Sequence, residues 1–193
     1  FHWGGTIPEM ALTSIPFLMT PEKTKKFPGS DAAKLLDQKM EAKGVRNIAW
    51  MIDAGDGMFT SSKSPLIKPE DFKGVKVRGL SKIFDAGLIA MGAKPVAMPG
   101  SEVYQGMQTG VIDAGFTAVD STYQRRFYEV QKFGVASNTL VAYDNIIVNP
   151  AWWNSLPDAV RKGIETSARS AEQRTLHLAD GVPAKPIEEL RAK

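Results

Sequence analysis

The chain has 193 residues, of which 43% are hydrophobic and 23% are charged, and its formal net charge is +3. These values are typical of one large or two small globular domains and exclude a disordered chain. Cysteine is absent, which excludes disulfides, thiolate metal sites and cysteine nucleophiles. Lys and Arg form no dense stripe, which argues against nucleic acid, and no apolar run approaches the roughly 20 residues of a membrane helix. The first residues show neither an initiator Met nor a signal peptide, so we expect a fragment.

The first 75 residues combine loop with one predicted helix and one predicted strand. The stretch before Ser30 is rich in Pro, Gly and Thr, which favours loop with a short strand or turn at Ile15–Met19. From Ser30 the apolar residues recur at helical spacing, and Ser30 and Gly44 are suited to begin and end that helix. A strand is predicted at Val45–Ile52, and a polar linker runs through Ser61–Pro65.

The next segment alternates strands and helices with short connections. It begins with one helical turn at Pro69–Lys73, where Pro stands at the first helical position. The predicted strands are Val75–Arg78, Pro95–Met98 and Val111–Phe116, and the predicted helices run from Ser81 to Gly92, from Ser101 to Gly110 and from Val119 to about Tyr128. This βαβαβα order predicts right-handed crossovers and a parallel sheet.

The last third of the chain is predicted to hold one more strand and a long helix. A mostly apolar strand is expected at Leu140–Asn149, followed by a turn at Pro150–Leu156. Pro157 then begins a helix that extends towards Leu178. The turn carries two adjacent Trp residues. Such a pair before a long helix favours packing of the helix onto the core, and stacking on a ligand is the alternative.

Candidate binding residues stand where the predicted parallel strands end. Ligands collect at that edge of an open α/β sheet, because the following helices present free N–H groups and positive dipole ends. The candidate residues at these positions are Arg78, Ser81, Met98, Gly100, Phe116 and Thr117. A guanidinium beside a capping Ser is a bidentate receptor for a carboxylate, so Arg78 predicts an organic acid as the ligand. The alternative is that Arg78 alternates with Lys76 on a solvated strand face.

No enzyme signature stands out, and we predict no catalytic residue, no metal and no cofactor. The two His residues are isolated, and the sequence lacks a zinc-protease motif, a dinucleotide fingerprint, a phosphate-binding loop and a nucleophile elbow. Ser101 is suited to cap a helix. The carboxylates between Asp53 and Asp71 fall largely in turns that favour acidic residues anyway. Phe116 either lines an apolar pocket or closes the sheet.

Several segments occur together in a specific order and spacing. They are Lys68–Arg78 (KPEDFKGVKVR), Gly92–Met98 (GAKPVAM), Ser101–Asp113 (SEVYQGMQTGVID) and Phe127–Val130 (FYEV), with flanking matches at Ile15–Leu18 and Val148–Pro157. In these segments the sequence resembles the solute-binding proteins of tripartite ATP-independent periplasmic (TRAP) transporters, the DctP-like family. Chains of that family begin well before Phe1 and continue past Lys193, so we expect most ligand contacts of one lobe to be missing.

The resemblance implies a periplasmic receptor whose two α/β lobes close on an organic acid, which is then delivered to a membrane permease driven by an ion gradient. The family's ligand-clamping Arg falls on Arg78, and a second pocket position falls on Thr117. Phe116 stands where the family has an acidic residue, which implies a less polar pocket without metal-assisted binding. A basic residue of sialic-acid-binding relatives falls near Met58, which argues against sialic acid.

We therefore predict an α/β, periplasmic-binding-protein-like fold of two lobes with parallel-rich sheets flanked by helices, one lobe being incomplete. Residues 1–75 are assigned to part of the first lobe and the crossing segment, 76–137 to the second lobe, and 138–193 to the return to the first lobe and the long helix. The predicted partners are the organic acid and the permease subunits, with no nucleic acid, and the chain itself does not span a membrane. Two other functions stay open: the ligand-binding module of a sensor, and a small-acid enzyme on the same scaffold.

Overall fold

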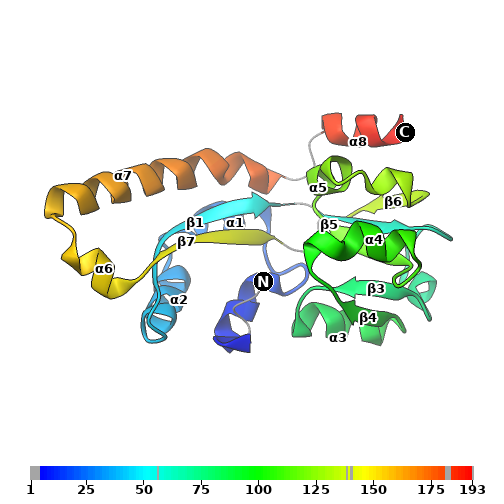
Figure 1. The fold of residues 1–193 in the computed structure, drawn as a ribbon, viewed down its shortest axis with the longest axis horizontal. Coiled ribbons are helices and arrows are strands. Elements are labelled where there is room, and N and C mark those ends of the chain that lie inside the picture. The colour runs from blue at the N-terminus through cyan, green and yellow to red at the C-terminus, as the bar shows by residue number, and fades with distance from the viewer. Residues whose placement is uncertain (1–4, 56, 138, 140, 181–183, 193) are drawn as a thin grey trace.

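The computed structural model describes residues 5–55, 57–137, 139, 141–180 and 184–192. Two separate sheets with their helices lie side by side along the long axis of the molecule (Figure 1). A two-stranded sheet consists of β1 (Arg46–Ala54) and β7 (Ala142–Val148). The other sheet has five strands in the order β4-β3-β5-β2-β6. These strands are β2 (Met58–Ser61), β3 (Lys76–Gly79), β4 (Lys94–Ala97), β5 (Ala114–Thr117) and β6 (Phe133–Ala136).

The antiparallel pair β1–β7 carries the core of the first unit. Helices α2 (Asp31–Glu41) and α7 (Asp158–Thr175) pack on β1 and lie on opposite sides of the pair in Figure 1. The Ser30 hydroxyl caps α2 by accepting a hydrogen bond from the Ala33 N–H at 3.2 Å, which confirms the predicted helix start. The rings of Phe27, Trp50 and Tyr143 meet at centroid distances of 5.0 to 6.0 Å and form the centre of this core.

The five-stranded sheet is mixed. Strand β3 pairs parallel with β4 and β5, whereas β2 pairs antiparallel with β5 and β6. Its connecting helices are α3 (Lys82–Ala90), α4 (Val103–Gln108) and α5 (Val119–Gln124). The parallel pairing of β3 with β4 and β5 confirms the predicted parallel sheet, but the short strands β2 and β6 were not predicted. Strand β2 lies in the stretch that leads into the predicted polar linker, and it joins this sheet rather than the one formed by β1 and β7.

Two predictions of loop or turn were wrong because local capping forms helices there. The segment before Ser30 contains a 3-10 helix at Pro8–Ser14 and the helix α1 (Pro21–Lys26). The Thr20 hydroxyl caps α1 by accepting from the Lys23 N–H at 3.3 Å. The predicted turn at Pro150–Leu156 is instead the helix α6 (Pro150–Ser155). The side-chain oxygen of Asn149 accepts from two main-chain N–H groups at the start of α6, at 2.9 and 3.1 Å.

The two adjacent Trp residues of α6 differ in exposure. Trp153 is 2% exposed, with the Arg46 guanidinium 5.7 Å from its ring centroid, whereas Trp152 is 48% exposed. Burial of Trp153 agrees with the favoured packing role.

Other elements are shorter than predicted. The helix predicted from Val119 to Tyr128 ends as α5 at Gln124, because Arg126 adopts a left-handed φ of 58° before a 3-10 turn at Phe127–Glu129. Helix α7 follows Pro157 as predicted but gives way to a 3-10 helix at Leu176–Asp180. Strand β5 begins at Ala114 rather than Val111, and β7 at Ala142, while Leu140 lies outside the described residues. The last described helix is α8 (Ala184–Arg191).

Candidate ligand-binding site

Arg78 lies at the edge of the five-stranded sheet where three neighbouring strands end. It stands on β3, and its Nε donates to the Met98 carbonyl, just beyond β4, at 3.3 Å. Its Nη1 donates to the Phe116 carbonyl on β5 at 3.4 Å. The residue is half-buried, so it does not occupy a fully solvated strand face. Burial lowers the pKa of the guanidinium, and nearby Arg125 lowers it further, yet an Arg side chain stays charged at physiological pH.

A second guanidinium, that of Arg125, reaches the same place from the C-terminal end of α5. Its Nη1 donates to the Gly100 carbonyl at 2.9 Å. A Cβ atom added to Gly100 would lie 2.8 Å from Nη1 of Arg125 and 3.4 Å from Nη2 of Arg78. The two cations therefore both lie against Gly100. The sequence carried no signal for Arg125, because it stands in an Arg pair at the exposed end of a helix.

The other predicted residues contribute mainly main-chain groups to this edge. The hydroxyl of Ser81 caps α3 by accepting from the Phe84 N–H at 3.2 Å. The Phe116 ring is 3% exposed and packs on Phe59 and Phe84 at 4.6 and 5.1 Å, so it closes the core of the sheet. The thioether of Met98 packs towards α4.

Thr117, the last residue of β5, is half-buried and pairs with Met58 of β2. Together with the Arg78 contacts, the structure brings Arg78, Met98, Gly100 and Phe116 into one cluster.

A carboxylate of the two-stranded sheet, that of Asp53, lies within electrostatic range of Arg125. Asp53 stands near the end of β1, and Asp144 on β7 is opposite Met51 in the register. Partial burial raises the pKa of the Asp53 carboxyl, and the charge of Asp144 raises it further, while Arg125 acts in the opposite direction. Of the cations beside Gly100, Arg125 is therefore the one that acts on an acid of the two-stranded sheet, Asp53.

The arrangement at Arg78 is suited to bind an anion. Both guanidiniums donate to neutral carbonyls, and within the described ranges neither forms an ion pair with a carboxylate. Arg78 is half-buried and Arg125 is exposed, and an anion that binds between the two cations lowers their mutual repulsion. Among the same residues, no group of three or more His, Asp or Glu side chains is placed to hold a metal ion.

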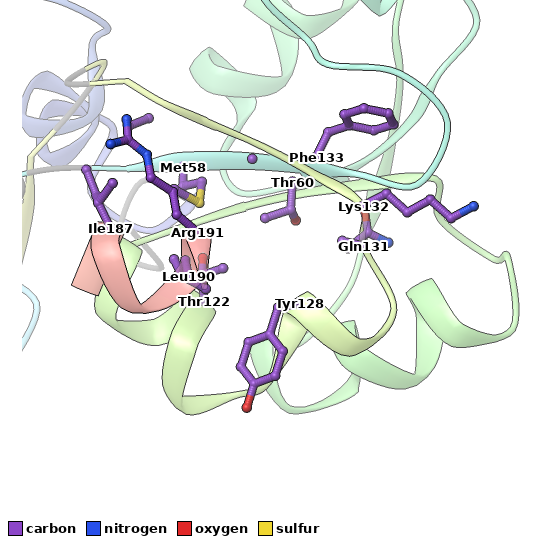
Figure 2. A pocket seen from close by; sticks show the side chains of 12 residues that line it. Met58, Thr60, Thr122, Tyr128, Gln131, Lys132, Phe133, Ile187, Leu190 and Arg191 are labelled. Atoms are coloured by element: carbon purple, nitrogen blue, oxygen red, sulfur yellow. The ribbon is translucent and has the colours of Figure 1, made fainter. Parts of the chain in front are cut away.

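A separate cavity of about 410 Å³ lies between α8, α5 and the β2–β6 edge of the sheet (Figure 2). Its lining includes Thr60, Thr122 and Gln131, together with Ile187, Leu190 and Arg191 of α8. None of the six predicted binding residues lines it. The Thr60 hydroxyl and the Gln131 side-chain oxygen are buried and lack a hydrogen-bond partner among the described residues. Lys132 and Arg191, the cations among the described residues that line this cavity, are both exposed, so we do not assign the acid to it.

None of the helices in the described part of the chain combines the length and apolar character that crossing a membrane requires.

Comparison with known proteins places the whole chain in one family. The profile of "Bacterial extracellular solute-binding protein, family 7" (DctP) matches residues 1–193. The C4-dicarboxylate-binding periplasmic protein DctP of Rhodobacter capsulatus is 35% identical over 161 residues, which cover 82% of this chain and 48% of that protein. The chain thus spans about half the length of the curated relatives that it matches.

Solved structures confirm the fold. A TRAP periplasmic solute-binding protein from Roseobacter denitrificans with bound β-D-glucuronate has a TM-score of 0.85 and 27% identity, covering 98% of this chain and 62% of that one. Another from Sulfurospirillum deleyianum with bound succinate has a TM-score of 0.87 and 25% identity, with the same coverage of 98% and 62%. These matches confirm the periplasmic-binding-protein-like α/β fold and the resemblance seen in the sequence. The chain belongs to the DctP family of bacterial extracellular solute-binding proteins, family 7.

Proposed function

We propose that the full-length protein is an extracytoplasmic receptor of a TRAP transporter, which captures an organic acid by its carboxylate and delivers it to the membrane permease. One observation carries the proposal. The half-buried guanidinium of Arg78 lies where three strands end and donates to main-chain carbonyls at 3.3 and 3.4 Å, with no carboxylate partner among the described residues. A carboxylate would replace these long, neutral contacts with shorter, charge-assisted hydrogen bonds.

The ligands of related proteins support this chemistry. The Rhodobacter capsulatus relative is named for C4-dicarboxylates, and the two solved structures hold succinate and β-D-glucuronate. Each of these compounds carries at least one carboxylate. The family description, which names an extracellular protein, supports a periplasmic location.

We assign ligand contacts to Arg78 and Thr117 and to the main chain of Met98, Gly100 and Phe116. The capping role of Ser81 supports the site indirectly, because it holds the start of α3 next to β3. In the proposed two-lobe division, residues 76–137 form the lobe that carries Arg78 and supply one wall of the ligand cleft. Residues 1–75 and 138–193 supply the lobe that faces it. The pairing of β2 with β5 and β6 extends the wall to Met58–Ser61.

We also propose that the protein is a receptor without catalytic activity of its own. The groups that contact the Arg78 guanidinium are carbonyl oxygens, which neither donate nor accept protons in acid–base catalysis. Asp53, which Arg125 influences electrostatically, and Asp144 lie on the strands of the other unit, and they suit the closing face of a cleft.

A thermal-shift screen of the full-length protein against mono- and dicarboxylates and sugar acids tests the proposal. A ligand present at 100 times its dissociation constant stabilises the folded state by about 2.7 kcal/mol, which is a readily measured shift. We expect at least one organic acid to stabilise the protein, while its neutral amide analogue does not. A protein that responds to neither class, or to both equally, would contradict carboxylate capture. Consumption of the acid during the assay would contradict the assignment as a receptor.

A further inference from the structure

The 410 Å³ cavity beside α8 has two residues in its wall whose side-chain oxygens are buried and lack a hydrogen-bond partner among the described residues. They are Thr60, which is 3% exposed, and Gln131, which is 7% exposed. In Figure 2 both lie across the cavity from Ile187 of α8. Buried polar groups are nearly always hydrogen-bonded, because an unpaired one in the interior is costly. Two such oxygens in the wall of one cavity therefore indicate a partner that binds there.

The position of Thr60 in the sheet explains why its hydroxyl is left over. Strand β2 lies between β5 and β6, and Thr60 stands directly opposite Gly115 on one side and Gly134 on the other. Residues directly opposite in an antiparallel pair share one face of the sheet, so no cross-strand side chain reaches this hydroxyl. The side chains of Met107 and Met58 lie where Gly115 and Gly134 would carry a Cβ atom, and a thioether is only a weak acceptor.

The second oxygen, that of Gln131, can only accept a hydrogen bond. The side-chain N–H₂ of Gln131 donates to the Val130 carbonyl at 3.0 Å. Only the nitrogen of an amide donates to a carbonyl, so this bond fixes the orientation of the amide and leaves its oxygen as the free atom. A partner for this oxygen must carry an N–H or O–H donor. An ionised carboxylate has no donor, and the cations that line the cavity, Lys132 and Arg191, are exposed.

The rest of the wall is suited to a compact apolar body. Met58 of β2 and Ile187 and Leu190 of α8 contribute apolar side chains. The volume lies within the range of about 300 to 1,000 Å³ that is typical of small-molecule sites. The lining residues Gly134 and Ala136 of the edge strand β6 are exposed, so the cavity is reached from solvent on that side.

We propose that this cavity is a second binding site, separate from the strand ends around Arg78, for a small neutral molecule with one O–H or N–H donor on an apolar body. The donor binds the Gln131 oxygen, and the Thr60 hydroxyl bonds to the same polar end of the molecule. Because both oxygens are buried, binding requires a small shift of the wall, which the flexible side chain of Met58 allows. The two sites then differ in chemistry: the strand ends take a carboxylate, and the cavity takes an uncharged donor.

NMR titration of the full-length protein with phenol and with toluene tests the site, because the two molecules have nearly the same shape and differ by a hydroxyl in place of a methyl group. We expect phenol to bind at least about 5-fold more tightly than toluene, as for one or two neutral hydrogen bonds. Phenol should shift the main-chain amide signals of β6 and α8, and benzoate should not. Absence of these shifts with phenol, equal shifts with benzoate, or equal affinity for toluene would overturn the proposal.

Two variants remove the oxygens while nearly keeping the side-chain shape. Thr60→Val and Gln131→Met should each weaken phenol binding by about 3- to 10-fold and change toluene binding by less than about 2-fold. Thr122→Val is the matched control, because the Thr122 hydroxyl lines the same cavity but already donates to the Ala118 carbonyl, and phenol affinity should not change. Equal losses of phenol and toluene binding in the first two variants would show a general disturbance of the wall and refute the hydrogen bonds.

Two further variants locate the bound phenol. Arg78 does not line the cavity, so Arg78→Ala should leave phenol affinity unchanged. Leu190→Trp fills the cavity from α8 and should abolish phenol binding, with circular dichroism verifying that the variant is folded. Loss of phenol binding in Arg78→Ala would place phenol at the strand ends, and retained binding in folded Leu190→Trp would place it outside the cavity. Either result would overturn the second site without affecting the proposed capture of an acid by Arg78.

Discussion

The Glu172 carboxylate accepts a hydrogen bond from the main-chain N–H of Trp50 at 3.0 Å, although 122 residues separate the two along the chain. Two positions further along β1, the Ile52 N–H donates to the Thr175 hydroxyl, also at 3.0 Å. Side chains of α7 thus provide hydrogen-bond acceptors for two main-chain N–H groups on the edge of β1 that does not pair with β7. An unpaired strand edge exposes N–H groups that otherwise need water or another strand. Helix α7 therefore completes the two-stranded sheet rather than merely covering it.

Replacing Glu172 tests this attachment. The carboxylate is buried, with 3% of the residue exposed, and Arg169 also donates to it at 3.1 Å. Glu172→Ala leaves the buried Trp50 N–H without an acceptor and should lower the free energy of unfolding by about 2 to 3 kcal/mol. Denaturant titration of the full-length protein measures this value. Glu165→Ala, an exposed change on the same helix, is the control, and equal effects of the two variants would contradict the role of Glu172.

The Tyr143 hydroxyl provides a second link, from β7 to α1. It donates to the Thr24 carbonyl at 2.9 Å within the aromatic core. Tyr143→Phe keeps the ring and removes this bond, so we expect a loss of about 1 kcal/mol in the free energy of unfolding.

Tyr143 should also make the free energy of unfolding depend on pH in the alkaline range. Burial raises the pKa of Tyr143 in the folded state, with the bond to Thr24 acting in the opposite direction. The unfolded state then loses its proton first, near pH 10, so this contribution to stability is complete below about pH 10 and falls as the pH rises further. Unfolding measured at pH 8 and 10.5 should show a steeper fall for the wild type than for Tyr143→Phe, and parallel falls would refute this.

Asp53 and Asp71 should give opposite responses to acid. Burial and the charge of Asp144 raise the pKa of Asp53, so its ionisation opposes folding and its share of stability is lost as the pH rises above about 4. Hydrogen bonds from the Lys68 and Ile67 N–H groups lower the pKa of Asp71, so its stabilising effect is lost as the pH falls below about 4. Asp53→Asn should raise the melting temperature at pH 7, and Asp71→Asn should lower it.

The differences in melting temperature between each variant and the wild type should become smaller near pH 3, where both carboxyls of the wild type are increasingly protonated in the unfolded state. Thermal melts of the two variants and the wild type from pH 3 to 7 measure the pattern. The assignment of Asp53 is wrong if both variants change stability in the same direction at pH 7.

Two threonines in the wall of the 410 Å³ cavity differ in hydrogen bonding. The Thr60 hydroxyl is buried without a partner among the described residues, whereas the Thr122 hydroxyl donates to the Ala118 carbonyl at 3.1 Å. Thr60→Val keeps the shape and removes a buried polar atom, so we expect the free energy of unfolding to rise by about 1 kcal/mol. Thr122→Val should not raise it. Denaturant titration of both variants decides the point, and a loss of stability in Thr60→Val would contradict the expectation.

Local chemistry explains which elements were predictable. Ser30 and Ser81 cap α2 and α3 as the sequence indicated, because a side-chain oxygen three residues before an N–H is a contact within one turn. Strand β2, by contrast, is only four residues long, and its two partners lie on β5 and β6, more than fifty residues away. No local pattern marks so short a buried strand, since its pairing depends on tertiary contacts.

The candidate site divides in the same way. Arg78 was predictable because it stands at the end of a strand in a recognisable order of strands and helices. Arg125 was not, because its proximity to Arg78 arises from the approach of its side chain to Gly100, 25 residues away. The role of Phe116 also needed the structure, which places its ring in the core of the sheet and so decides between the two alternatives that the sequence left open.

The strongest expected effect on binding belongs to Arg78. If its guanidinium holds the ligand carboxylate in the closed cleft, Arg78→Ala leaves the fold intact and weakens binding by roughly 2 to 5 kcal/mol, as for one partner of a buried, hydrogen-bonded charge pair. Arg78→Lys should recover only part of this loss, because an ammonium keeps the charge but lacks the planar fork that binds both carboxylate oxygens. Thr117→Ala should cost less, about 0.5 to 1.5 kcal/mol, if its hydroxyl supplies one neutral hydrogen bond.

Calorimetry of the full-length variants with the acid identified in the screen measures these losses, and circular dichroism verifies that each variant is folded. The order of the affinities matters more than any single value. We expect Arg78→Ala to bind the acid most weakly, Arg78→Lys to be intermediate, and Thr117→Ala to be nearest to the wild type. An Arg78→Lys variant that binds as tightly as the wild type would reduce the role of Arg78 to a point charge. Unchanged affinity in a folded Arg78→Ala variant would mean that the Arg78 guanidinium does not hold the ligand, and it would remove the observation on which the assignment of the binding site to these three strand ends depends.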